Sequence, residues 1–410
     1  MGIAIVGANL AGASAARTLR ENGYDDEVYL IGEENVLPYE RPPLSKEFLS
    51  NPHASVSEII IHDEAFYNDA RIELELGVRC TELDIQRRKV SLSDGRSLSA
   101  ENIILCTGSR PRKLQIPGSE LEGIFYLRTL DDARAIAPQL TEGAQLVLIG
   151  MGVIGAEVAA SARKCGCSVV AIEPQAIPMA RTLGPVLGNW LADIHRSEGV
   201  DVRLQAQVTE FKGGQNRVDS VVLKTGEIIA ADLIVVGVGV EPAIDLASNC
   251  GIKTDNGIVV DSTGLSSVDC VYAAGDVANR PLFEGGRGRC ETYQNAIDMG
   301  TFAARAITGT ATGNIIPAWF WSDQYDLNIQ SVGSCLSSET VIRGNLNSRS
   351  FTLFYLEGST VTGAVSINRP RDMAASKRMV EKRAEIDRNQ LGDEDSDLRH
   401  ILKAALQSQK

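Results

Sequence analysis

The sequence predicts an α/β fold, because one pattern of strand, glycine-rich turn, helix and second strand occurs twice along the 410 residues. Each copy ends on an acidic residue. The strand, turn and acid of the two copies are residues 3–6, Gly7 to Gly12 and Glu33, and residues 146–149, Gly150 to Gly155 and Glu173. Repeated strand-helix-strand units build parallel sheets with helices packed on their faces. Two Rossmann-like dinucleotide-binding domains are therefore expected.

The helix and second strand of each copy follow from the hydrophobic pattern after its turn. In the first copy, residues 13–22 are expected to be helical and residues 27–31 to form a strand. In the second copy, residues 156–164 are expected to be helical and residues 168–172 to form a strand.

The residues at these spacings suit a dinucleotide. The first glycine allows a tight turn, the second lets the backbone approach a pyrophosphate, and the third lets helix and strand pack closely. The acid accepts hydrogen bonds from ribose hydroxyls. Asn9 stands where the first copy should have its second glycine, whereas Gly152 holds that place in the second copy. Because Asn adopts unusual backbone angles more readily than most residues, the first turn is interpreted as a modified binding site.

Composition excludes several classes of partner. The chain carries 53 acidic and 40 basic side chains, and its formal charge of -13 disfavours nucleic acid and anionic membranes. The first apolar run, residues 3–6, is only as long as a strand, so no leader segment is expected, and no later run is long enough to span a membrane. The eight cysteines are irregularly spaced and form neither a disulfide framework nor a metal-ligand pattern, which favours a reducing cytoplasm. No metal site is expected.

The last part of the chain predicts a smaller α+β domain. Alternating apolar runs at residues 350–355 and 360–365 indicate strands of an antiparallel sheet, with Gly358 and Ser359 as a tight turn between them. A charged helical tail follows. The four histidines have no spacing that indicates a metal site or a catalytic triad, and they are expected to be surface or core residues without a role; they are His53, His62, His195 and His400.

Several segments along nearly the whole chain resemble the FAD-dependent NADH:ferredoxin reductases of bacterial oxygenase systems, the family of putidaredoxin reductase and of the aromatic-ring dioxygenase reductases. These segments are residues 38–46, 106–111, 126–130, 237–242, 271–276, 290–296 and 319–325. Flavoproteins similar to apoptosis-inducing factor share several of them. The resemblance implies that the first turn binds FAD and the second binds NADH, in a domain inserted into the FAD domain. The implied domains are residues 1–112 with 242–312 for FAD, 113–241 for NAD, and 313–410 for a C-terminal α+β interface domain.

The resemblance also implies roles for single residues. The turn residues at the FAD pyrophosphate would be Gly7, Asn9, Ala11 and Gly12. Glu33 would lie at the adenosine ribose, Arg41 at a phosphate or the adenine, and Cys80 would contact the adenine through its backbone. Further positions along the two cofactors are Thr107, Gly108, Arg128, Gly150, Gly152, Ile154, Gly155, Glu173, Gly239, Gly275, Asp276, Glu291 and Tyr293. Family members often have Trp at the position of Tyr293.

Three residues are expected at the reacting ends of the cofactors. By resemblance, Lys46 and Glu157 form a pair near the flavin N5 and the nicotinamide, and Trp321 lies at the flavin edge. Pro42 and Pro43 stiffen the chain before Lys46 and can direct its side chain inward. The alternative for Lys46 is a solvated charge, and the alternative for Glu157 is an acid that is favoured only because it lies in the first turn of a helix. The alternative for Trp321 is a tryptophan that only packs in the core.

The resemblance implies a reductase that passes electrons from NADH through FAD to a [2Fe-2S] ferredoxin. The ferredoxin would serve a terminal oxygenase that hydroxylates aromatic rings, and a monomer or weak homodimer is expected. Residues 33–79 contain no cysteine, so the chain lacks the thiol pair that disulfide reductases of this fold place beside the flavin. The alternatives are an NADH oxidase, a reductase for a rubredoxin or quinone-like acceptor, and a signalling flavoprotein. Glu173 favours NADH over NADPH, because a carboxylate repels a 2'-phosphate.

An acidic ferredoxin would need a basic patch on this acidic protein. Two groups of side chains are candidates for that patch. They are Arg280, Arg287 and Arg289, and Arg369, Arg371, Lys377, Arg378, Lys382 and Arg383. A solvated helix face is the alternative for the second group.

Overall fold

The computed structural model describes residues 2–310 and 313–408, which form two compact units. The first unit contains residues 1–40, 55–110 and 240–318, and the second contains residues 41–54, 111–239 and 319–410. Residues 41–54 thus belong with the second unit, whereas they were expected in the FAD domain. The division into three domains stays a prediction.

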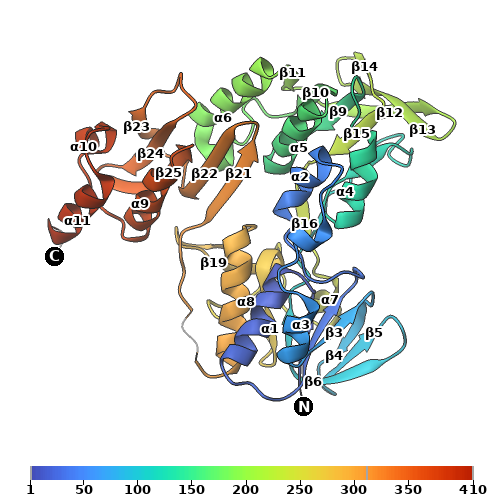
Figure 1. Cartoon of the computed structure of the whole chain (residues 1–410). Helices are drawn as coiled ribbons and strands as arrows, with labels where there is room; N and C mark the ends of the chain where they lie inside the picture. The colour runs from blue at the N-terminus through green and yellow to red at the C-terminus, as the bar shows by residue number, and fades with distance from the viewer. Residues whose placement is uncertain (1, 311–312, 409–410) are drawn as a thin grey trace. The chain divides into compact units, whose positions relative to one another are not determined.

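The first unit is built on a seven-stranded sheet with the strand order β3-β2-β1-β6-β5-β4, in which β18 also pairs with β6 (Figure 1). Strands β1, β2, β3, β6 and β18 pair in parallel, and β4 and β5 extend the sheet as an antiparallel hairpin. The strands are β1 (Gly2–Val6), β2 (Val28–Gly32), β3 (Ile72–Leu76), β4 (Cys80–Asp84), β5 (Lys89–Leu92), β6 (Ser97–Leu105) and β18 (Val271–Ala273).

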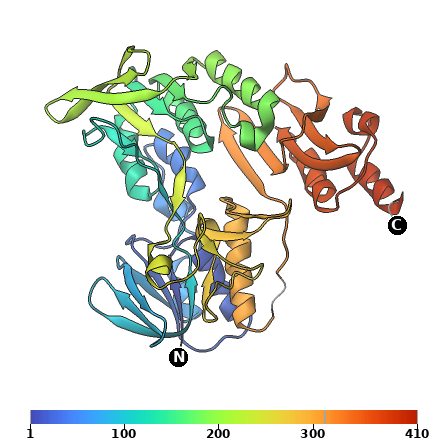
Figure 2. The ribbon, with the colours of Figure 1, turned by 180° about the vertical axis from the view of Figure 1, so that it is seen from behind.

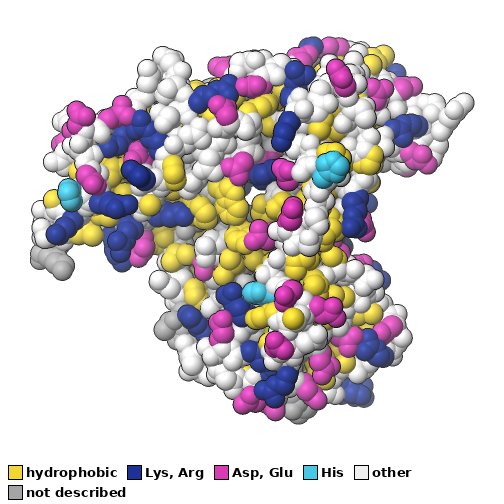
Figure 3. Space-filling model, in the orientation of Figure 1, with side chains coloured by type: hydrophobic (Ala, Val, Ile, Leu, Met, Phe, Trp, Pro, Cys, Tyr) yellow, Lys and Arg dark blue, Asp and Glu magenta, His cyan; other side chains and the backbone are white. Residues whose placement is uncertain are grey.

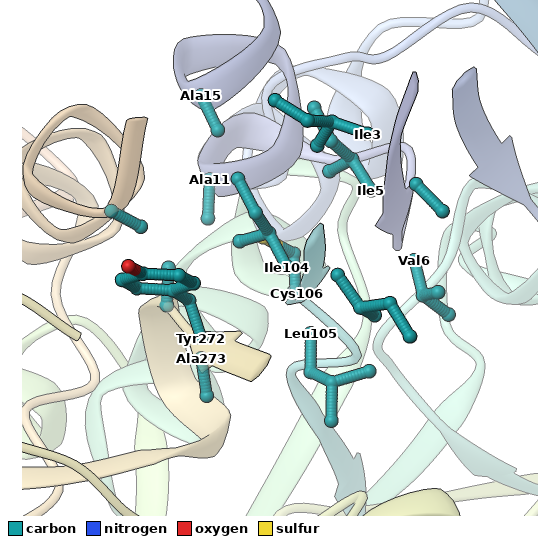
Figure 4. Close-up of a cluster of buried hydrophobic side chains, with 14 of the residues drawn as sticks. Ile3, Ile5, Val6, Ala11, Ala15, Ile104, Leu105, Cys106, Tyr272 and Ala273 are labelled. Carbon is teal, nitrogen blue, oxygen red and sulfur yellow. The ribbon is translucent and has the colours of Figure 1, made fainter. Parts of the chain in front are cut away.

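The core of the first unit lies between this sheet and two helices, α1 (Leu10–Glu21) and α8 (Tyr293–Ile307). Figure 4 shows side chains of β1, α1, β6 and β18 converging there. The two helices approach closely because Gly300 has no side chain: a Cβ at Gly300 would lie 2.2 Å from the backbone oxygen of Ala11. The remaining elements are α3 (Glu64–Asp69), α7 (Asp245–Asn249), the one-turn helices η2 (Val56–Glu58) and η4 (Gly275–Val277), and the short strands β7 (Ser109–Pro111), β16 (Val240–Pro242), β17 (Ile258–Val259), β19 (Ala278–Pro281) and β20 (Arg287–Gly288).

The Rossmann-like part of the second unit is built on a five-stranded parallel sheet with the strand order β11-β10-β9-β15-β8. Its strands are β8 (Ile124–Tyr126), β9 (Gln145–Ile149), β10 (Ser168–Glu173), β11 (Val200–Leu204) and β15 (Leu233–Val236). A three-stranded sheet of β12 (Val208–Gly214), β13 (Arg217–Leu223) and β14 (Ile228–Ala230) accompanies it. The helices of this part are α2 (Glu47–Ser50), α4 (Leu130–Ile136), α5 (Val153–Lys164), α6 (Ala180–Ser197), η1 (Pro42–Ser45) and η3 (Ala137–Gln139).

The C-terminal part of the second unit is the expected antiparallel sheet with helices. Its strand order is β21-β22-β25-β24-β23, and the predicted two-residue turn at Gly358 and Ser359 joins β24 to β25. Figure 2 shows this sheet beside α6 of the same unit. The elements are β21 (Trp319–Gln324), β22 (Leu327–Gly333), β23 (Glu339–Gly344), β24 (Phe351–Glu357), β25 (Thr360–Ile367), α9 (Pro370–Glu381), α10 (Arg388–Gly392) and α11 (Leu398–Ser408).

A shared hydrophobic core joins α6 to this C-terminal sheet. Helix α6 bends at Gly184, which has a positive φ of 74° and precedes Pro185. A Cβ at Gly184 would lie 2.5 Å from the hydroxyl of Tyr355, which donates a hydrogen bond to the Leu183 carbonyl. The bend therefore fits α6 around the ring of Tyr355.

Both helices after the glycine turns begin three residues earlier than predicted, at Leu10 and Val153. The turn itself supplies the N-caps, Asn9 and Gly152, so the helices start inside the glycine motif. Among the described residues, no helix is both long and apolar enough to cross a membrane, and the expected cytoplasmic location stays a prediction.

Candidate functional site

The first glycine turn joins β1 to α1 and lies against the end of β6. Gly7 has a φ of 123°, and a Cβ there would lie 2.1 Å from the Cys106 carbonyl oxygen. A Cβ at Gly12 would lie 2.1 Å from the Gly7 carbonyl oxygen. Both positions therefore need glycine for backbone packing, as the motif predicted.

Asn9 caps α1 with its side chain. Its Oδ1 accepts hydrogen bonds from the backbone N–H groups of Ala11 and Gly12 at 3.1 and 3.3 Å, and its Nδ2 donates to the Cys106 carbonyl at 2.6 Å. The backbone of Asn9 is extended, with φ -137°. The reason given for tolerating Asn here, unusual backbone angles, is therefore wrong: Asn9 fits as an N-cap that also ties the turn to β6.

Gly275 and Asp276, which belong to the later motif expected to bind FAD, lie on η4 and pack against the helix that follows this first turn. Gly275 has a φ of 77°, and a Cβ there would lie 3.2 Å from the Cβ of Ala11, so η4 packs directly on α1. Asp276 accepts a hydrogen bond from the Ser109 hydroxyl at 3.1 Å. Residues predicted to bind one cofactor from distant parts of the sequence thus meet within the first unit.

Buried polar atoms without a protein partner lie on α8 and the nearby β19. Three of them are Oδ1 of Asn295, Oδ2 of Asp298 and Nε of Arg280. Burial raises the pKa of the Asp298 carboxyl. Buried polar atoms in native proteins normally have partners, so these three fit a region completed by a polar cofactor or by water. The residues of the first unit therefore fit the FAD that the first turn was expected to bind.

Tyr293 begins α8 and donates a hydrogen bond to the Glu40 carboxylate at 2.6 Å. Burial, followed by this carboxylate, raises the pKa of Tyr293. Glu291 forms an ion pair with Arg289 at 2.8 Å. The side chains predicted beside FAD at this helix are thus already engaged in polar contacts of their own.

The predicted adenosine end carries an exposed acid and a buried thiol. The Glu33 side chain is exposed and lies 3.9 Å from Arg79. Cys80 is buried on β4, and burial raises the pKa of its thiol to about 12. A buried, protonated thiol at this position agrees with the predicted contact through the backbone.

Thr107 and Gly108 connect the end of β6 to the returning chain in the first unit. The Thr107 hydroxyl donates to the Ala243 carbonyl at 2.8 Å, and the Gly108 carbonyl accepts from the Ala243 N–H at 3.0 Å. In the second unit, the Arg41 side chain donates to the Arg128 carbonyl at 2.6 Å. The structure thus joins the segment after β6 to residue 243, and the segment of Arg41 to that of Arg128.

The second glycine turn joins β9 to α5 and is more open than the first. A Cβ at Gly150 would lie 2.4 Å from the Gly237 carbonyl oxygen, and one at Gly155 would lie 2.1 Å from the Gly150 carbonyl oxygen. At Gly152, by contrast, an added Cβ would meet no atom within 4 Å, and no side chain caps α5. A helix N-terminus that no side chain caps, with open space at its N-cap glycine, suits a pyrophosphate. Ile154, in the first turn of α5, is 44% exposed.

Glu173 ends β10 and supports this second turn. Its two carboxylate oxygens accept hydrogen bonds from the backbone N–H groups of Met151 and Gln175, at 2.8 and 2.9 Å. The side chain is buried, with 8% exposure. The predicted ribose ligand therefore also holds the shape of the glycine turn. Gly239, after β15, has a φ of 96° and accepts a hydrogen bond from the Arg112 N–H.

Lys46 and Glu157 form the predicted ion pair within the second unit. Lys46 Nζ lies 2.8 Å from Glu157 Oε2, and the side chains are 21% and 2% exposed. Lys46 Nζ also donates to the Pro42 carbonyl at 3.0 Å, so the preceding prolines do direct it inward. The Ser45 hydroxyl donates to the same Glu157 oxygen. A nearly buried carboxylate is thus held by one ammonium and one hydroxyl, and the solvated alternative for Lys46 does not describe it.

Trp321 lies on β21 and stacks on Trp319, with ring centroids 5.4 Å apart. Lys377 of α9 covers the Trp319 ring at 3.2 Å from its centroid. Burial lowers the pKa of the Lys377 ammonium to about 8. The two indoles and the ammonium form one stack, so Lys377 is engaged by an aromatic ring and is not a freely solvated charge.

Several residues around Glu157 were not predicted. Ser45, Ser322, Gln324 and His195 form polar contacts that lead to its carboxylate. Ser322 and Gln324 lie in the segment that resembles the family, two residues apart on β21, so both point to the same side of the strand. His195 was expected to be a surface or core residue without a role, and the structure places it in the core, with 0% exposure, among these contacts.

The cysteines do not form a reactive centre. All eight lie within the described ranges and are free thiols. Burial raises the pKa of Cys167 to about 11, and that of Cys106 and Cys335 to about 12. Thiols react as thiolates, so these side chains are not poised for redox exchange. In the described ranges, no group of three or more His, Cys, Asp or Glu side chains is arranged to hold a metal ion.

Comparison with known proteins gives two family matches. The pyridine nucleotide-disulphide oxidoreductase family matches residues 1–300, and the reductase C-terminal family matches residues 319–402. The chain is 37% identical to the ferredoxin-NAD(+) reductase subunit of a benzene 1,2-dioxygenase system from Pseudomonas putida, over 100% of this chain and 99% of that one. It is 40% identical to a rubredoxin-NAD(+) reductase from Pseudomonas putida, over 82% of this chain and 87% of that one.

A solved structure is similar over the same length. The reductase in a covalent putidaredoxin reductase-putidaredoxin complex superposes with a TM-score of 0.94 at 34% identity, covering 99% of both chains. The predicted α/β fold class with a C-terminal reductase domain is thereby confirmed.

Proposed function

The chain belongs to the pyridine nucleotide-disulphide oxidoreductase family, among its ferredoxin-NAD(+) reductases, and we propose that it carries electrons from NADH through FAD to a [2Fe-2S] ferredoxin that serves an aromatic-ring oxygenase. One observation carries the proposal: two glycine turns accompany a nearly buried Lys46-Glu157 pair, without a redox thiol pair. When bound, FAD supplies the conversion of a two-electron hydride donor to single-electron release.

The residues of the first unit hold the FAD. The turn from Gly7 to Gly12 receives the pyrophosphate, and Asp276 binds the ribityl chain or the pyrophosphate beside it. The support for these roles is that η4 packs on α1 and that Asn295 and Asp298 carry buried polar atoms without protein partners. Asn9 fixes the shape of the turn and the start of α1.

The residues of the second unit hold and orient the NADH. The uncapped N-terminus of α5 at Gly152 receives the pyrophosphate, and Glu173 accepts a hydrogen bond from the 2'-hydroxyl of the adenosine ribose. Lys46, held by Glu157, places a positive charge toward the nicotinamide. No side chain has to move a proton in this reaction, so the protein contributes position and electrostatics.

The basic side chains of α9 and the residues just after it are the proposed docking surface for the ferredoxin. Arg371, Arg378, Lys382 and Arg383 are exposed there, and Figure 3 shows Lys and Arg side chains gathered over α9 and α11. Charge of the opposite sign to an acidic ferredoxin increases its rate of encounter and orients it.

The first candidate group suits docking less well than α9. Arg280 is 7% exposed, and the Arg289 side chain is 11% exposed and paired with Glu291. The guanidinium of Arg287 donates to the backbone carbonyls of Val260 and Asn279. These arginines hold their own loop together.

Two double variants test this docking surface. Arg378→Glu with Lys382→Glu reverses two exposed charges at α9, and Lys212→Glu with Lys224→Glu reverses two exposed charges at β12 and just after β13. At low ionic strength, the α9 variant should reduce ferredoxin about tenfold more slowly, with ferricyanide reduction unchanged. The control variant should keep both rates. A ferredoxin rate that changes equally in the two variants would show that net charge matters and the α9 surface does not.

The acceptor itself is tested by NADH-driven reduction of cytochrome c in the presence of ferredoxin, of rubredoxin, or of neither. The proposal predicts a rate that rises in proportion to ferredoxin and stays low with rubredoxin. A high rate without either protein would favour an NADH oxidase or a small-molecule acceptor. A preference for rubredoxin would favour the alternative that the rubredoxin-NAD(+) reductase relative represents.

A further inference from the structure

A chain of polar side chains leads from Glu157 into the interior of the second unit. Glu157 Oε1 accepts a hydrogen bond from the Ser322 hydroxyl at 2.7 Å, and Ser322 accepts one from the Gln324 amide nitrogen at 2.9 Å. The Gln324 oxygen lies 2.9 Å from His195 Nε2, and the Tyr325 hydroxyl lies 2.8 Å from His195 Nδ1. Four of the five side chains are buried, with exposures of 2% or less: Glu157, Ser322, Gln324 and His195.

The direction of every hydrogen bond in this chain follows from the carboxylate at its end. An ionised carboxylate only accepts, so the single hydroxyl proton of Ser322 is used on Glu157. Gln324 must then present its amide nitrogen to Ser322 and its oxygen to His195. His195 therefore carries its proton on Nε2, which leaves Nδ1 to accept from Tyr325. All donors point toward Glu157.

The other oxygen of Glu157 is held from a different part of the unit. Oε2 receives Lys46 and Ser45, at the junction of η1 and α2. The Ser45 carbonyl in turn accepts from the Ser161 hydroxyl of α5 at 2.8 Å. Both carboxylate oxygens are thus fixed, one by the segment that carries Lys46 and one by β21.

We propose that Ser322, Gln324 and His195 are positioning residues for hydride transfer. They fix the carboxylate of Glu157, and the carboxylate in turn aims the Lys46 ammonium. This inference rests on the proposed function, because it takes Lys46 to act at the nicotinamide. It also gives a function to the polar interior between α6 and β21, which lie side by side in the second unit (Figures 1 and 2).

Stability alone gives little reason for such a chain in a core. Apolar side chains of similar volume often stabilise a protein as well as a buried polar cluster does, whereas a fully satisfied cluster fixes one arrangement. Fixed geometry is what hydride transfer needs, since a displacement of about 1 Å between reacting groups can cost about a hundredfold in rate. The hydrogen-bonded side chains from His195 to Ser322 supply that fixed geometry at the Glu157 carboxylate.

The test is a double-mutant cycle between Ser322→Ala and Glu157→Gln, read by anaerobic stopped-flow reduction of the bound flavin by NADH alone. Ser322→Ala should slow reduction about tenfold at saturating NADH, with NADH affinity nearly unchanged, and should have little further effect in the Glu157→Gln background. Ser322→Thr keeps the hydroxyl and should restore most of the rate. Ser331→Ala is the matched control, because it removes a buried hydroxyl of the same sheet that donates to the Thr182 carbonyl.

A second readout does not depend on turnover. Acetylation of Lys46, followed by mass spectrometry, should be several-fold faster in Ser322→Ala and in Tyr325→Phe than in the wild type or in Ser331→Ala, because Glu157 no longer holds the ammonium. Unchanged labelling in both variants, or multiplicative effects of Ser322→Ala and Glu157→Gln on flavin reduction, would overturn the inference. An FAD-loaded wild-type protein whose flavin is not reduced by NADH would instead refute the proposed function. The labelling of Lys46 would still decide whether this series of hydrogen bonds positions its ammonium.

Discussion

His195 should make the folded protein sensitive to mild acid. Burial lowers the pKa of its imidazole from 6.5 to about 4 in the folded state, against weaker opposing effects from Gln324 and Glu198. Below pH 6.5 the His195 imidazole binds a proton in the unfolded chain but not in the folded protein. Stability is therefore lost as the pH falls from about 6.5 toward about 4, and this loss amounts to about 2 kcal/mol at pH 5.

The variant His195→Gln removes this titration and keeps an amide that can donate to Gln324. Chemical unfolding at pH 7 and pH 5, followed by circular dichroism, should show that the wild type loses about 2 kcal/mol more than the variant over this interval. His53→Gln is the control, since His53 is exposed and the variant should match the wild type. Equal losses in the wild type and His195→Gln would refute the placement of a neutral, fully enclosed imidazole in this core.

Three further predictions concern the cofactors and the thiols. Glu173→Arg should narrow the preference for NADH over NADPH in kcat/KM and also lower the NADH value itself, because Glu173 supports the glycine turn; an unchanged preference would refute the ribose contact. Lys46→Met should slow flavin reduction in stopped flow by about tenfold or more while FAD stays bound, since Glu157 loses its ammonium partner; a wild-type rate would make the pair structural. The double variant Cys165→Ser with Cys167→Ser should keep NADH-to-ferredoxin flux within a few-fold of the wild type, and complete loss of flux in folded, FAD-loaded protein would contradict a thiol-independent mechanism.

Local patterns along the sequence predicted the two glycine turns and their acids, because a glycine is needed where the backbone packs within 2.1 Å of an added Cβ, as at Gly7 and Gly155. The Lys46-Glu157 pair joins residues 111 positions apart, and only the family resemblance implied it. The same reasoning misplaced the helix starts, because the caps lie inside the turns. It also gave the wrong reason for Asn9, whose side chain caps α1 and donates to the distant Cys106 carbonyl.

The sequence could not predict the hydrogen-bond partners of His195. Its partners Gln324 and Tyr325 lie 129 and 130 residues away, and only the packing of α6 on the C-terminal sheet brings them together. A single histidine without neighbours of matching spacing carries no local signal. In the same way, the sequence grouped Arg280, Arg287 and Arg289 as a candidate patch, whereas Arg280 is buried, Arg289 pairs with Glu291, and the exposed Arg287 donates to two backbone carbonyls.

The central claim is that two electrons enter together from NADH and leave one at a time to a ferredoxin. Its most direct test is an anaerobic titration in which a catalytic amount of the FAD-loaded protein meets excess oxidised [2Fe-2S] ferredoxin and limiting NADH. The account predicts about two ferredoxins reduced for each NADH consumed, with no thiol oxidised. Full reduction of the bound flavin by NADH with no reduction of the ferredoxin would contradict it.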